Sequence, residues 1–371
     1  MPCQSHSIRH DLHPFPKIIH SETFISLKTI FTTMNTINMK QWVDQLIARK
    51  DVTAIPIMTH PGIELIGKTV RDAVTDGQVH YEAIKALYEK YPSAASCVIM
   101  DLTVEAEAFG AEILFPENEV PSVIGRLLND ESAIEALQVP DLTKGRISEY
   151  LKANRLAAEH LTDRPVLAGC IGPYSLAGRL YDMSEIMMLI YINSDAARML
   201  LAKCSEFLTN YCLALKEVGA NGVIMAEPAA GLLSNEDCQQ FSSEFVKDII
   251  AKVQDEHFAV ILHNCGNMGN CTKAMVYTGA MGYHFGNKID MVEALKEVPS
   301  DALAMGNIDP VSIFKMGSVD TMKQSVQALL DATQAYPNFV LSSGCDTPPH
   351  TPFANIDAFY SALNDYNTSR I

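Results

Sequence analysis

Basic residues are scarce in this 371-residue sequence, in which 28 Lys and Arg stand against 44 Asp and Glu, for a formal net charge of −16. No dense basic patch follows residue 40, so nucleic acid is not an expected partner. No apolar run reaches the roughly 18 residues that a membrane-spanning helix needs, so no membrane segment is expected. No GxGxxG motif follows the first predicted strand, which removes support for a Rossmann dinucleotide site.

Cysteine spacing typical of a small disulfide scaffold is also missing, although the sequence holds nine cysteines. An odd, scattered set favours a reducing compartment in which thiols stay free or bind metal, so we expect a cytoplasmic protein. Charged residues make up only 19% of the chain and apolar residues 48%. This composition predicts a large buried core rather than disorder.

Residues 1–38 lack the hydrophobic periodicity of the rest of the chain. They hold four of the eleven histidines at irregular spacing, and few acidic residues. We interpret this stretch as a poorly ordered N-terminal extension or as sequence upstream of the natural start. Residues 39–371 contain no Pro/Gly-rich linker and are predicted to form a single catalytic domain.

Short apolar runs with the character of buried strands alternate with longer helical patterns. The runs are at residues 54–58, 97–101, 166–171, 222–227, 258–263, 280–285, 302–306 and 339–343. Helical stretches between them include residues 184–218, 235–254 and 320–335, and the last two open on Asn235 and Asp320, which can cap a helix. This order predicts an α/β fold, a (β/α)8 TIM barrel with extra N-terminal helices; a doubly wound open sheet is the alternative. Residues 101–142 are expected to add a small lobe or helix over the barrel mouth.

Two short motifs at predicted strand ends carry side chains that bind zinc. His263-Asn264-Cys265 ends the strand predicted at residues 258–263, and Cys345 follows the last strand in Ser-Gly-Cys-Asp. The carboxyl ends of the strands meet at the face where a TIM barrel gathers its catalytic groups. One imidazole and two thiolates are a strong zinc donor set, and His263 and Cys265 point the same way if strand geometry persists. The alternative is that Cys265 and Cys345 act only as small buried hydrophobic residues. This is our interpretation of the other seven cysteines of the chain.

Three protein ligands would leave one tetrahedral position for water, a substrate thiol or a labile side chain. Such an open position is typical of catalytic zinc, whereas a structural zinc is normally closed by four protein ligands. The sequence therefore predicts a catalytic metal site made of His263, Cys265 and Cys345.

These residues resemble the uroporphyrinogen decarboxylase superfamily, and within it the zinc methyltransferases that act on methylated corrinoid proteins. In those enzymes a His-x-Cys follows one barrel strand and a Gly-Cys follows the last, which is the pattern of His263, Cys265 and Cys345. Four further stretches are similar to the family, at residues 55–62, 100–110, 172–179 and 306–310. The resemblance starts near Met39, and the nearest type is the methylcobamide:coenzyme M methyltransferase.

The resemblance implies a zinc-dependent transfer of a methyl group from a methylated corrinoid protein to a small thiol such as coenzyme M. It implies Zn²⁺ as the cofactor, a methylcobamide as the methyl donor, and a mouth wide enough to dock the corrinoid protein. Zinc would keep the thiol deprotonated at neutral pH. The resemblance does not name the thiol and makes no prediction of the oligomeric state.

The sequence departs from the family pattern at two places. The decarboxylase branch holds its substrate carboxylates with an arginine-rich N-terminal segment, whereas residues 56–67 of this chain contain no arginine. Some methyltransferases of this type place an acidic side chain near the zinc after the sixth strand, where this chain has Asn287. With Asn287 in that place, the fourth ligand is expected to be water or another acid such as Glu227.

Further candidate site residues stand at or just after predicted strand ends. Glu227 and Asp101 are predicted to be catalytic, by tuning the metal, holding a proton or binding substrate, with capping or a salt bridge as the alternative. Arg179 is a candidate for binding an anionic group such as a sulfonate, with a surface ion pair as the alternative. The other candidates for the cofactor-binding region are Tyr174, Asn264, Asn267 and Asn287, of which Asn264 and Asn267 could orient the metal ligands.

Two other functions stay open on sequence grounds. One is the decarboxylation of a tetrapyrrole by a metal-free site, which predicts activity that survives Cys265→Ser. The other is a non-catalytic corrinoid-binding module with a closed, structural zinc, which predicts that Cys345→Ala unfolds the protein. The methyltransferase hypothesis predicts that the same variant is folded but inactive.

Overall fold

The computed structural model describes residues 37–370 of the chain. Its first helix in this range, α2 (Met39–Ala48), begins at the residue expected to open the folded part. The side chain of Asn38 accepts a hydrogen bond from the backbone N–H of Gln41 at 2.9 Å, which satisfies one of the donors that a first helical turn leaves unpaired. The extension predicted over residues 1–38 falls almost wholly outside the described residues and stays a prediction.

Seven parallel strands form the central sheet, in the order β1-β4-β5-β6-β7-β8-β9. They are β1 (Ser96–Cys97), β4 (Val166–Ile171), β5 (Gly222–Ala226), β6 (Ala259–Asn264), β7 (Gly282–Phe285), β8 (Leu303–Ile308) and β9 (Phe339–Ser343). All seven overlap runs predicted from the sequence. Because the strands are parallel, their carboxyl ends lie on one face, which becomes the mouth of the barrel.

The first predicted run, residues 54–58, closes the barrel without forming a full strand. Ala54 makes a parallel bridge to Leu341 of β9, and the backbone N–H of Ile55 donates to the carbonyl of Leu341 at 2.9 Å. On the other side, the N–H of Ala94, just before β1, donates to the carbonyl of Ala54 at 2.9 Å. Pro56 has no N–H to continue the ladder, which explains why the segment is not a regular strand. The expected TIM barrel is confirmed.

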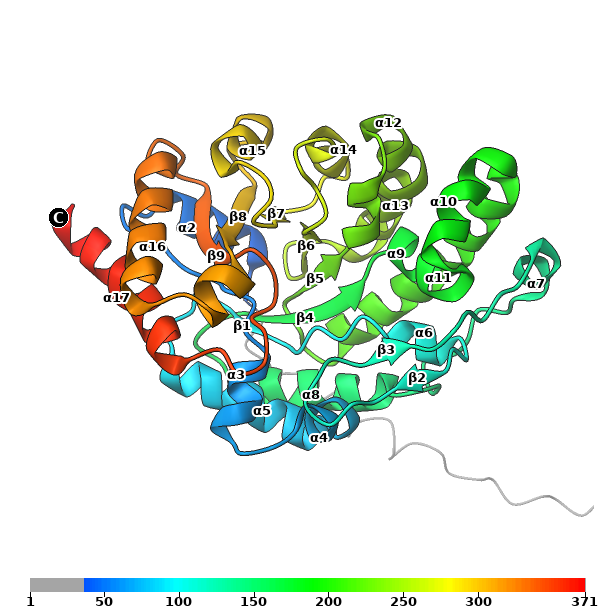
Figure 1. The fold of residues 1–371 in the computed structure, drawn as a ribbon, viewed down its shortest axis with the longest axis horizontal. Coiled ribbons are helices and arrows are strands. Elements are labelled where there is room, and N and C mark those ends of the chain that lie inside the picture. The colour runs from blue at the N-terminus through cyan, green and yellow to red at the C-terminus, as the bar shows by residue number, and fades with distance from the viewer. Residues whose placement is uncertain (1–36, 371) are drawn as a thin grey trace, which may run out of the picture. The chain divides into compact units, whose positions relative to one another are not determined.

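Helices surround the sheet, as Figure 1 shows. The extra N-terminal helices are α3 (His60–Leu65), α4 (Val70–Thr75) and α5 (Gly77–Lys90), and α8 (Ile147–His160) precedes β4. The later elements are α9 (Pro173–Tyr181), α10 (Met183–Ile192), α11 (Ser194–Glu217), η1 (Pro228–Leu232), α12 (Asn235–Cys238), η2 (Gln239–Ser243), α13 (Glu244–Val253), α14 (Thr272–Tyr277), α15 (Met291–Glu297), η3 (Pro310–Lys315), α16 (Val319–Thr333) and α17 (Phe353–Ser369). Among the helices of residues 37–370, none is both long and apolar enough to cross a membrane.

The ends of three predicted helices differ from the structure. The stretch 184–218 is broken at Asn193, whose side chain accepts from the N–H of Ala196 at 3.2 Å and so begins a new helix, α11. The predicted caps Asn235 and Asp320 are wrong, because Ser234 and Ser318 cap α12 and α16 with their hydroxyl groups. The residues predicted as caps lie in the first turns, where an acidic side chain such as Asp320 interacts favourably with the helix dipole.

Residues 101–142 form the small lobe expected from the length of this connection. It contains α6 (Val104–Ala108), a two-stranded antiparallel sheet of β2 (Ile113–Leu114) and β3 (Ser122–Val123), and α7 (Glu131–Ala136). Because the lobe follows β1 directly, it leaves the barrel at its carboxyl face.

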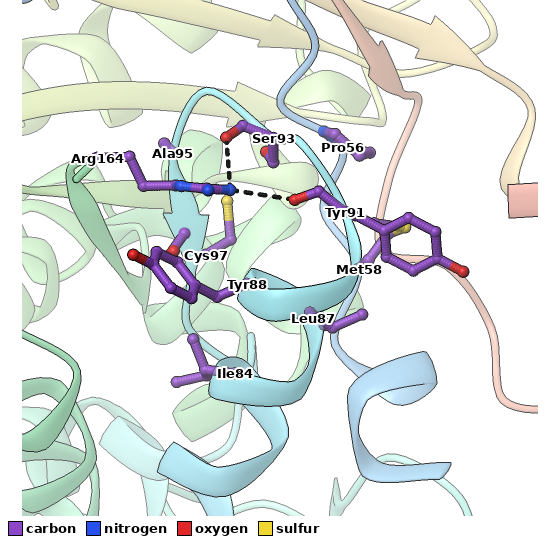
Figure 2. Close-up of a pocket in the computed structure, with 11 residues that line it drawn as sticks. Pro56, Met58, Ile84, Leu87, Tyr88, Tyr91, Ser93, Ala95, Cys97 and Arg164 are labelled. Atoms are coloured by element: carbon purple, nitrogen blue, oxygen red, sulfur yellow. Dashed lines mark hydrogen bonds between the residues drawn. The ribbon is translucent and has the colours of Figure 1, made fainter. Parts of the chain in front are cut away.

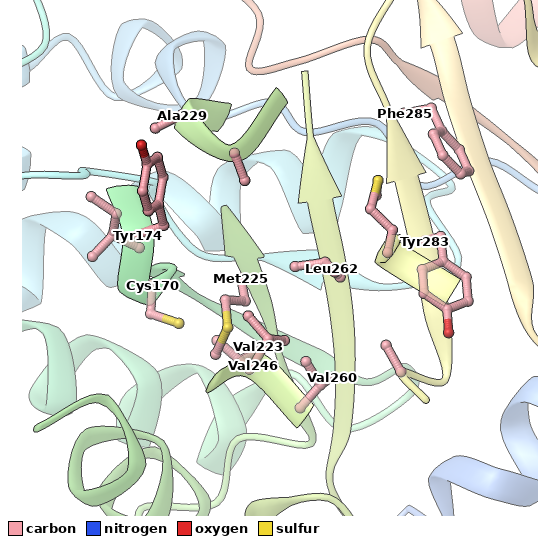
Figure 3. Packing of buried hydrophobic residues seen from close by; sticks show 14 of the residues in the cluster. Cys170, Tyr174, Val223, Met225, Ala229, Val246, Val260, Leu262, Tyr283 and Phe285 are labelled. Carbon is pink, nitrogen blue, oxygen red and sulfur yellow. The ribbon is translucent and has the colours of Figure 1, made fainter. Parts of the chain in front are cut away.

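Two apolar layers, one on each face of the sheet, hold the barrel together. The layer inside the barrel includes Ile57, Ile224, Ile261, Met305 and Val340, each at most 2% exposed. The outer layer packs against the helices and includes Val223, Met225, Val260, Leu262 and Val246 of α13, as Figure 3 shows. Inward and outward side chains alternate along each strand. A polar residue at the next inward position beyond the apolar layer therefore faces the mouth.

Candidate metal centre

The curvature of the sheet brings His263, Cys265 and Cys345 together at the carboxyl face. His263 takes the next inward position after Ile261 in β6, and Cys265 follows in the turn. Cys345 stands two residues beyond the end of β9. In sheet order β7 and β8 separate β6 from β9, so these side chains would be far apart on a flat sheet.

The three candidate ligands converge on one point. One ligand atom from each lies within 4.8 Å of the other two, and the Sγ of Cys345 is 3.6 Å from the Nε2 of His263. His263 is buried and both cysteines are half-buried. A hydrogen bond with Cys345 lowers the pKa of the Cys265 thiol to about 7, against the opposing effect of burial. The same hydrogen bond, together with burial, raises the pKa of Cys345, so Cys265 is the thiol that ionises more readily.

This donor set fits a tetrahedral zinc ion. Zinc binds thiolate at about 2.3 Å and imidazole nitrogen at about 2.0–2.1 Å, which places the two ligand atoms about 3.6 Å apart in a tetrahedron. The separation between Cys345 and His263 has this value. Within residues 37–370 no fourth His, Cys, Asp or Glu joins the group, Glu227 included. The three protein donors leave one coordination position for an outside ligand.

Asn264 and Asn267 shape the turn that presents Cys265. The Oδ1 of Asn264 accepts from the N–H groups of Gly266 and Asn267, both at 2.9 Å. The Oδ1 of Asn267 accepts from the N–H of Cys271 at 3.1 Å, and both asparagines are buried. The two asparagines thus hold the turn that carries Cys265, and their roles in orienting a metal ligand and in contacting a cofactor stay predictions.

Glycines allow the turns after β6, β7 and β9 to pack backbone against backbone. A Cβ on Gly286 would lie 2.7 Å from the Cα of Cys265, and one on Gly344 would lie 2.7 Å from the backbone N of Asn287. The side chain of Asn287 is exposed and donates to the Oδ2 of Asp309 at 2.8 Å. Asn287 thus lies beside the turn of Cys345, and its contact with a cofactor stays a prediction.

His284, which the sequence analysis did not single out, is the direct neighbour of His263. The two residues are paired in the register of β6 and β7, and their Nδ1 atoms are 2.8 Å apart. Burial, followed by the proximity of His263, lowers the pKa of His284 well below its ordinary value, so this ring is neutral. The contact depends on strand register, so no spacing in the sequence could have revealed it.

The carboxyl group of Glu227 caps α9. Its Oε1 accepts from the backbone N–H of Ser175, in the first turn of α9, at 2.8 Å. Its Oε2 is buried without a hydrogen-bond partner among the described residues. Burial raises the pKa of Glu227 to about 8, although hydrogen bonds from the backbone of Ser175 and Tyr174 oppose the shift. Glu227 therefore holds a proton at neutral pH, and its catalytic role stays a prediction.

Asp101 lies in a buried ion pair with Arg146. Its Oδ2 is 2.5 Å from the Nη1 of Arg146 and accepts from the hydroxyl of Tyr150 at 3.1 Å. Its Oδ1 accepts from the backbone N–H of Thr103 at 2.9 Å. Both oxygens are engaged by donors within the protein. The salt-bridge alternative describes these contacts, and a catalytic role for Asp101 stays a prediction.

Tyr174 and Arg179 both stand on α9, after β4, but in different surroundings. Tyr174 is fully buried, its hydroxyl has no partner among the described residues, and its ring packs in the cluster of Figure 3. Arg179 is half-buried, and its guanidinium makes no hydrogen bond or ion pair with any residue in the range 37–370. Burial lowers its pKa, and the more distant Asp101 offsets this only in part. The structure therefore does not contain the surface ion pair considered as the alternative for Arg179.

Figure 2 shows a cavity between α5 and β1 that contains none of the three metal donors. Its volume is about 30 Å³, and the guanidinium of Arg164 closes it by donating to the carbonyls of Tyr91 and Ser93 at 3.1 and 3.0 Å. Burial also raises the pKa of its thiol, Cys97. The cavity has room for one or two waters at most, so it cannot hold a large ligand.

Two curated proteins with methyltransferase names are similar to this chain over most of its length. The chain is 28% identical over 273 residues to the methylcobamide:CoM methyltransferase MtbA of Methanosarcina acetivorans, covering 72% of this chain and 79% of that protein. It is 27% identical over 344 residues to the methylcobamide:CoM methyltransferase MtaA of Methanosarcina barkeri, covering 90% and 99%.

The fold and the family assignment agree with these similarities. A solved structure described as a methyltransferase from Methanosarcina mazei superposes with a TM-score of 0.80 over 89% of this chain and 99% of that chain, at 23% identity, which shows a shared fold. Residues 46–366, most of the chain, match the family described as uroporphyrinogen decarboxylase (URO-D). The chain belongs to the uroporphyrinogen decarboxylase (URO-D) family.

Proposed function

We propose that this protein transfers a methyl group from a methylated corrinoid, carried by a partner protein, to a small thiol. The observation that carries the proposal is the convergence of His263, Cys265 and Cys345 within 4.8 Å at the carboxyl face of the barrel. The two relatives named as methylcobamide:CoM methyltransferases support a corrinoid donor and an acceptor such as coenzyme M. The absence of arginine from residues 56–67 argues against tetrapyrrole decarboxylation.

The chemistry requires a thiolate at neutral pH. A Zn²⁺ held by His263, Cys265 and Cys345 would lower the pKa of the acceptor thiol bound at the fourth position. The thiolate sulfur would attack the methyl carbon of the corrinoid. The carbon–cobalt bond would break with both of its electrons left on cobalt, and the proton of the thiol would pass to solvent. Glu227 and Asp101 are kept as the predicted catalytic side chains, and Asn264 and Asn267 would hold the turn that presents Cys265.

The surroundings of Arg179 support the proposal that the acceptor thiol carries an anionic group. Its guanidinium is half-buried on α9 and has no anionic partner within residues 37–370. An arginine in this state can form charge-assisted hydrogen bonds with a sulfonate or carboxylate. A panel of thiols should therefore include anionic and uncharged members, and we expect the anionic ones to react at lower concentration.

An apolar rim around the mouth supports docking of a partner protein. The rim consists of Leu232, Met268, Val311 and Met316, which are between 51% and 76% exposed. These residues lie on the segments that directly follow β5, β6 and β8, so they share the carboxyl face with the metal donors. Exposed apolar side chains gathered on one face are typical of an interaction surface.

The eight described cysteines are all free, which supports the expected reducing, cytoplasmic setting.

The proposal is tested by metal analysis together with demethylation of methylcobalamin over the thiol panel. We expect one zinc per chain and loss of the methylcobalamin spectrum that depends on thiol. Cys345→Ser should remain folded but lose zinc and turnover, because oxygen is a poorer zinc ligand than thiolate. Cys97→Ser is the matched control, since Cys97 is also a half-buried thiol but lies outside the donor group.

Other outcomes would support the competing functions. Turnover of a tetrapyrrole that survives Cys265→Ser would favour a metal-free decarboxylase. Bound zinc without turnover of any thiol, together with unfolding of Cys345→Ala, would favour a binding module with structural zinc. Either result would contradict methyl transfer at this site.

A further inference from the structure

We propose that His284 is a positioning residue that determines which nitrogen of His263 faces the metal, through a hydrogen-bond relay that starts at Ser342. The inference deepens the proposed function and rests on it for the identity of the metal. His263, His284 and Ser342 come from β6, β7 and β9, and all three are buried. They lie above the apolar layer inside the barrel, so the relay is shielded from water.

The direction of the relay follows from the hydroxyl of Ser342. This group donates its hydrogen to the carbonyl of Ile55 at 2.7 Å. A hydroxyl has only one hydrogen, so its oxygen must act as the acceptor toward the Nε2 of His284, which is 2.8 Å away. The Nε2 of His284 therefore carries a hydrogen. The carbonyl of Ile55 belongs to the segment that closes the barrel.

The second step fixes the hydrogen between the two histidines. A neutral imidazole with hydrogen on Nε2 has a lone pair on Nδ1, so the Nδ1 of His284 is an acceptor. The Nδ1 of His263, 2.8 Å away, must then be the donor. The lone pair of His263 consequently lies on Nε2, the atom that is 3.6 Å from the Sγ of Cys345. This is the tautomer that a metal ligand needs, and a partner on the other ring nitrogen is what usually sets it.

The neutral state of His284 follows from its surroundings. The ring is fully buried, its side-chain hydrogen-bond partners among residues 37–370 are His263 and Ser342, and the backbone of Ser343 also interacts with it. A buried cation without an anionic partner is unfavourable. A cationic His284 would also donate from Nδ1 and force the hydrogen of His263 onto Nε2, where it blocks metal binding. Ser342 can thus influence metal affinity although it contacts none of the three donors.

Zinc affinity of serine variants tests the relay. We expect Ser342→Ala to weaken zinc binding by roughly 10- to 100-fold, the usual effect of losing a hydrogen-bond partner behind a metal ligand. Ser342→Thr keeps the hydroxyl and should restore the affinity. The matched control is Ser343→Ala. Ser343 is equally buried, and its hydroxyl also bonds the barrel-closing segment, at Ile57, but no histidine.

A second measurement reads the relay without metal. In the full chain stripped of zinc and labelled with ¹⁵N-histidine, nitrogen-detected spectra should place the hydrogen of His263 on Nδ1 and that of His284 on Nε2. In Ser342→Ala both rings should show mixed tautomers, whereas Ser343→Ala should match the wild type. A folded Ser342→Ala protein with wild-type zinc affinity and tautomers would overturn the relay, and so would an equal loss in Ser343→Ala. If the wild type binds no zinc but shows the expected tautomers, the proposed function fails while the relay stands.

Discussion

At the scale of single residues, the buried carboxyl of Glu227 should make the stability of the protein depend on pH. Its pKa is raised by burial from an ordinary 4.5 to about 8. Between these values the folded chain keeps a proton that the unfolded chain has released. The free energy of unfolding should therefore fall as the pH rises from about 4.5 to about 8. Glu227→Gln keeps the shape of the side chain without its charge, so we expect a shallower fall in urea unfolding over this range.

The control for this pH dependence is an exposed glutamate. Glu206 lies on the solvent side of α11, and Glu206→Gln should keep the wild-type slope. Burial also raises the pKa of Glu105 to about 7, so Glu105 contributes to the same fall of stability with pH. The pH dependence of the Glu227 variant should therefore be reduced rather than abolished. An unchanged slope in Glu227→Gln would mean that Glu227 is ionised in the folded protein.

At the scale of elements, the junction of β4 and α9 depends on Gly172. A Cβ at this position would lie 1.5 Å from the Oε2 of Glu227 and 3.0 Å from its Cβ. Gly172→Ala must therefore displace Glu227 from the first turn of α9, and we expect a loss of about 1–3 kcal/mol in the free energy of unfolding. Urea denaturation monitored by circular dichroism measures the loss.

Two further variants make this packing argument specific. Gly169 lies in β4, three residues before Gly172. A Cβ there would lie 3.4 Å from its nearest neighbour, an ordinary contact, so we expect a much smaller effect for Gly169→Ala. Glu227→Ala removes the atoms that the new methyl group meets, and Gly172→Ala should cost less in that background. An equal cost in both backgrounds would show that the clash lies elsewhere.

At the scale of the whole molecule, the apolar rim predicts that a substitution in it slows methyl transfer from a corrinoid protein but not from free methylcobalamin. Met268→Glu places a charge on the carboxyl face without touching the donors. We expect transfer from a methylated corrinoid protein to fall about tenfold, which corresponds to about 1.4 kcal/mol of docking energy. Transfer from free methylcobalamin should stay at the wild-type rate, because a small donor does not need the rim.

A matched substitution away from the mouth tests whether location matters. Leu213 is 41% exposed in the last turns of α11, which lead toward the amino end of β5. Leu213→Glu should leave both reactions unchanged. Equal losses with the two methyl donors in Met268→Glu, or a loss in Leu213→Glu, would contradict docking at the rim.

Local patterns in the chain were enough to predict the barrel and to select the three side chains that it brings together, His263, Cys265 and Cys345. Buried parallel strands are short continuous apolar runs, and seven of the eight predicted runs became strands. The position of His263 and Cys345 at strand ends already implied a common face, because parallel strands end together. Pro56 limited the remaining run, residues 54–58, to a bridge. At two helix starts the serine just before the predicted cap proved to be the better acceptor.

Contacts between distant segments could be read only from the folded chain. His284 meets His263 because β6 and β7 pair in one register, and Ser342 reaches His284 because the sheet curls into a barrel. Glu227 turns toward α9, although its place at a strand end suggested the metal. The physical reason is that side-chain type and strand character are local properties of the chain. Register, curvature and burial arise only when segments pack together, and they decide the partners and protonation of each polar group.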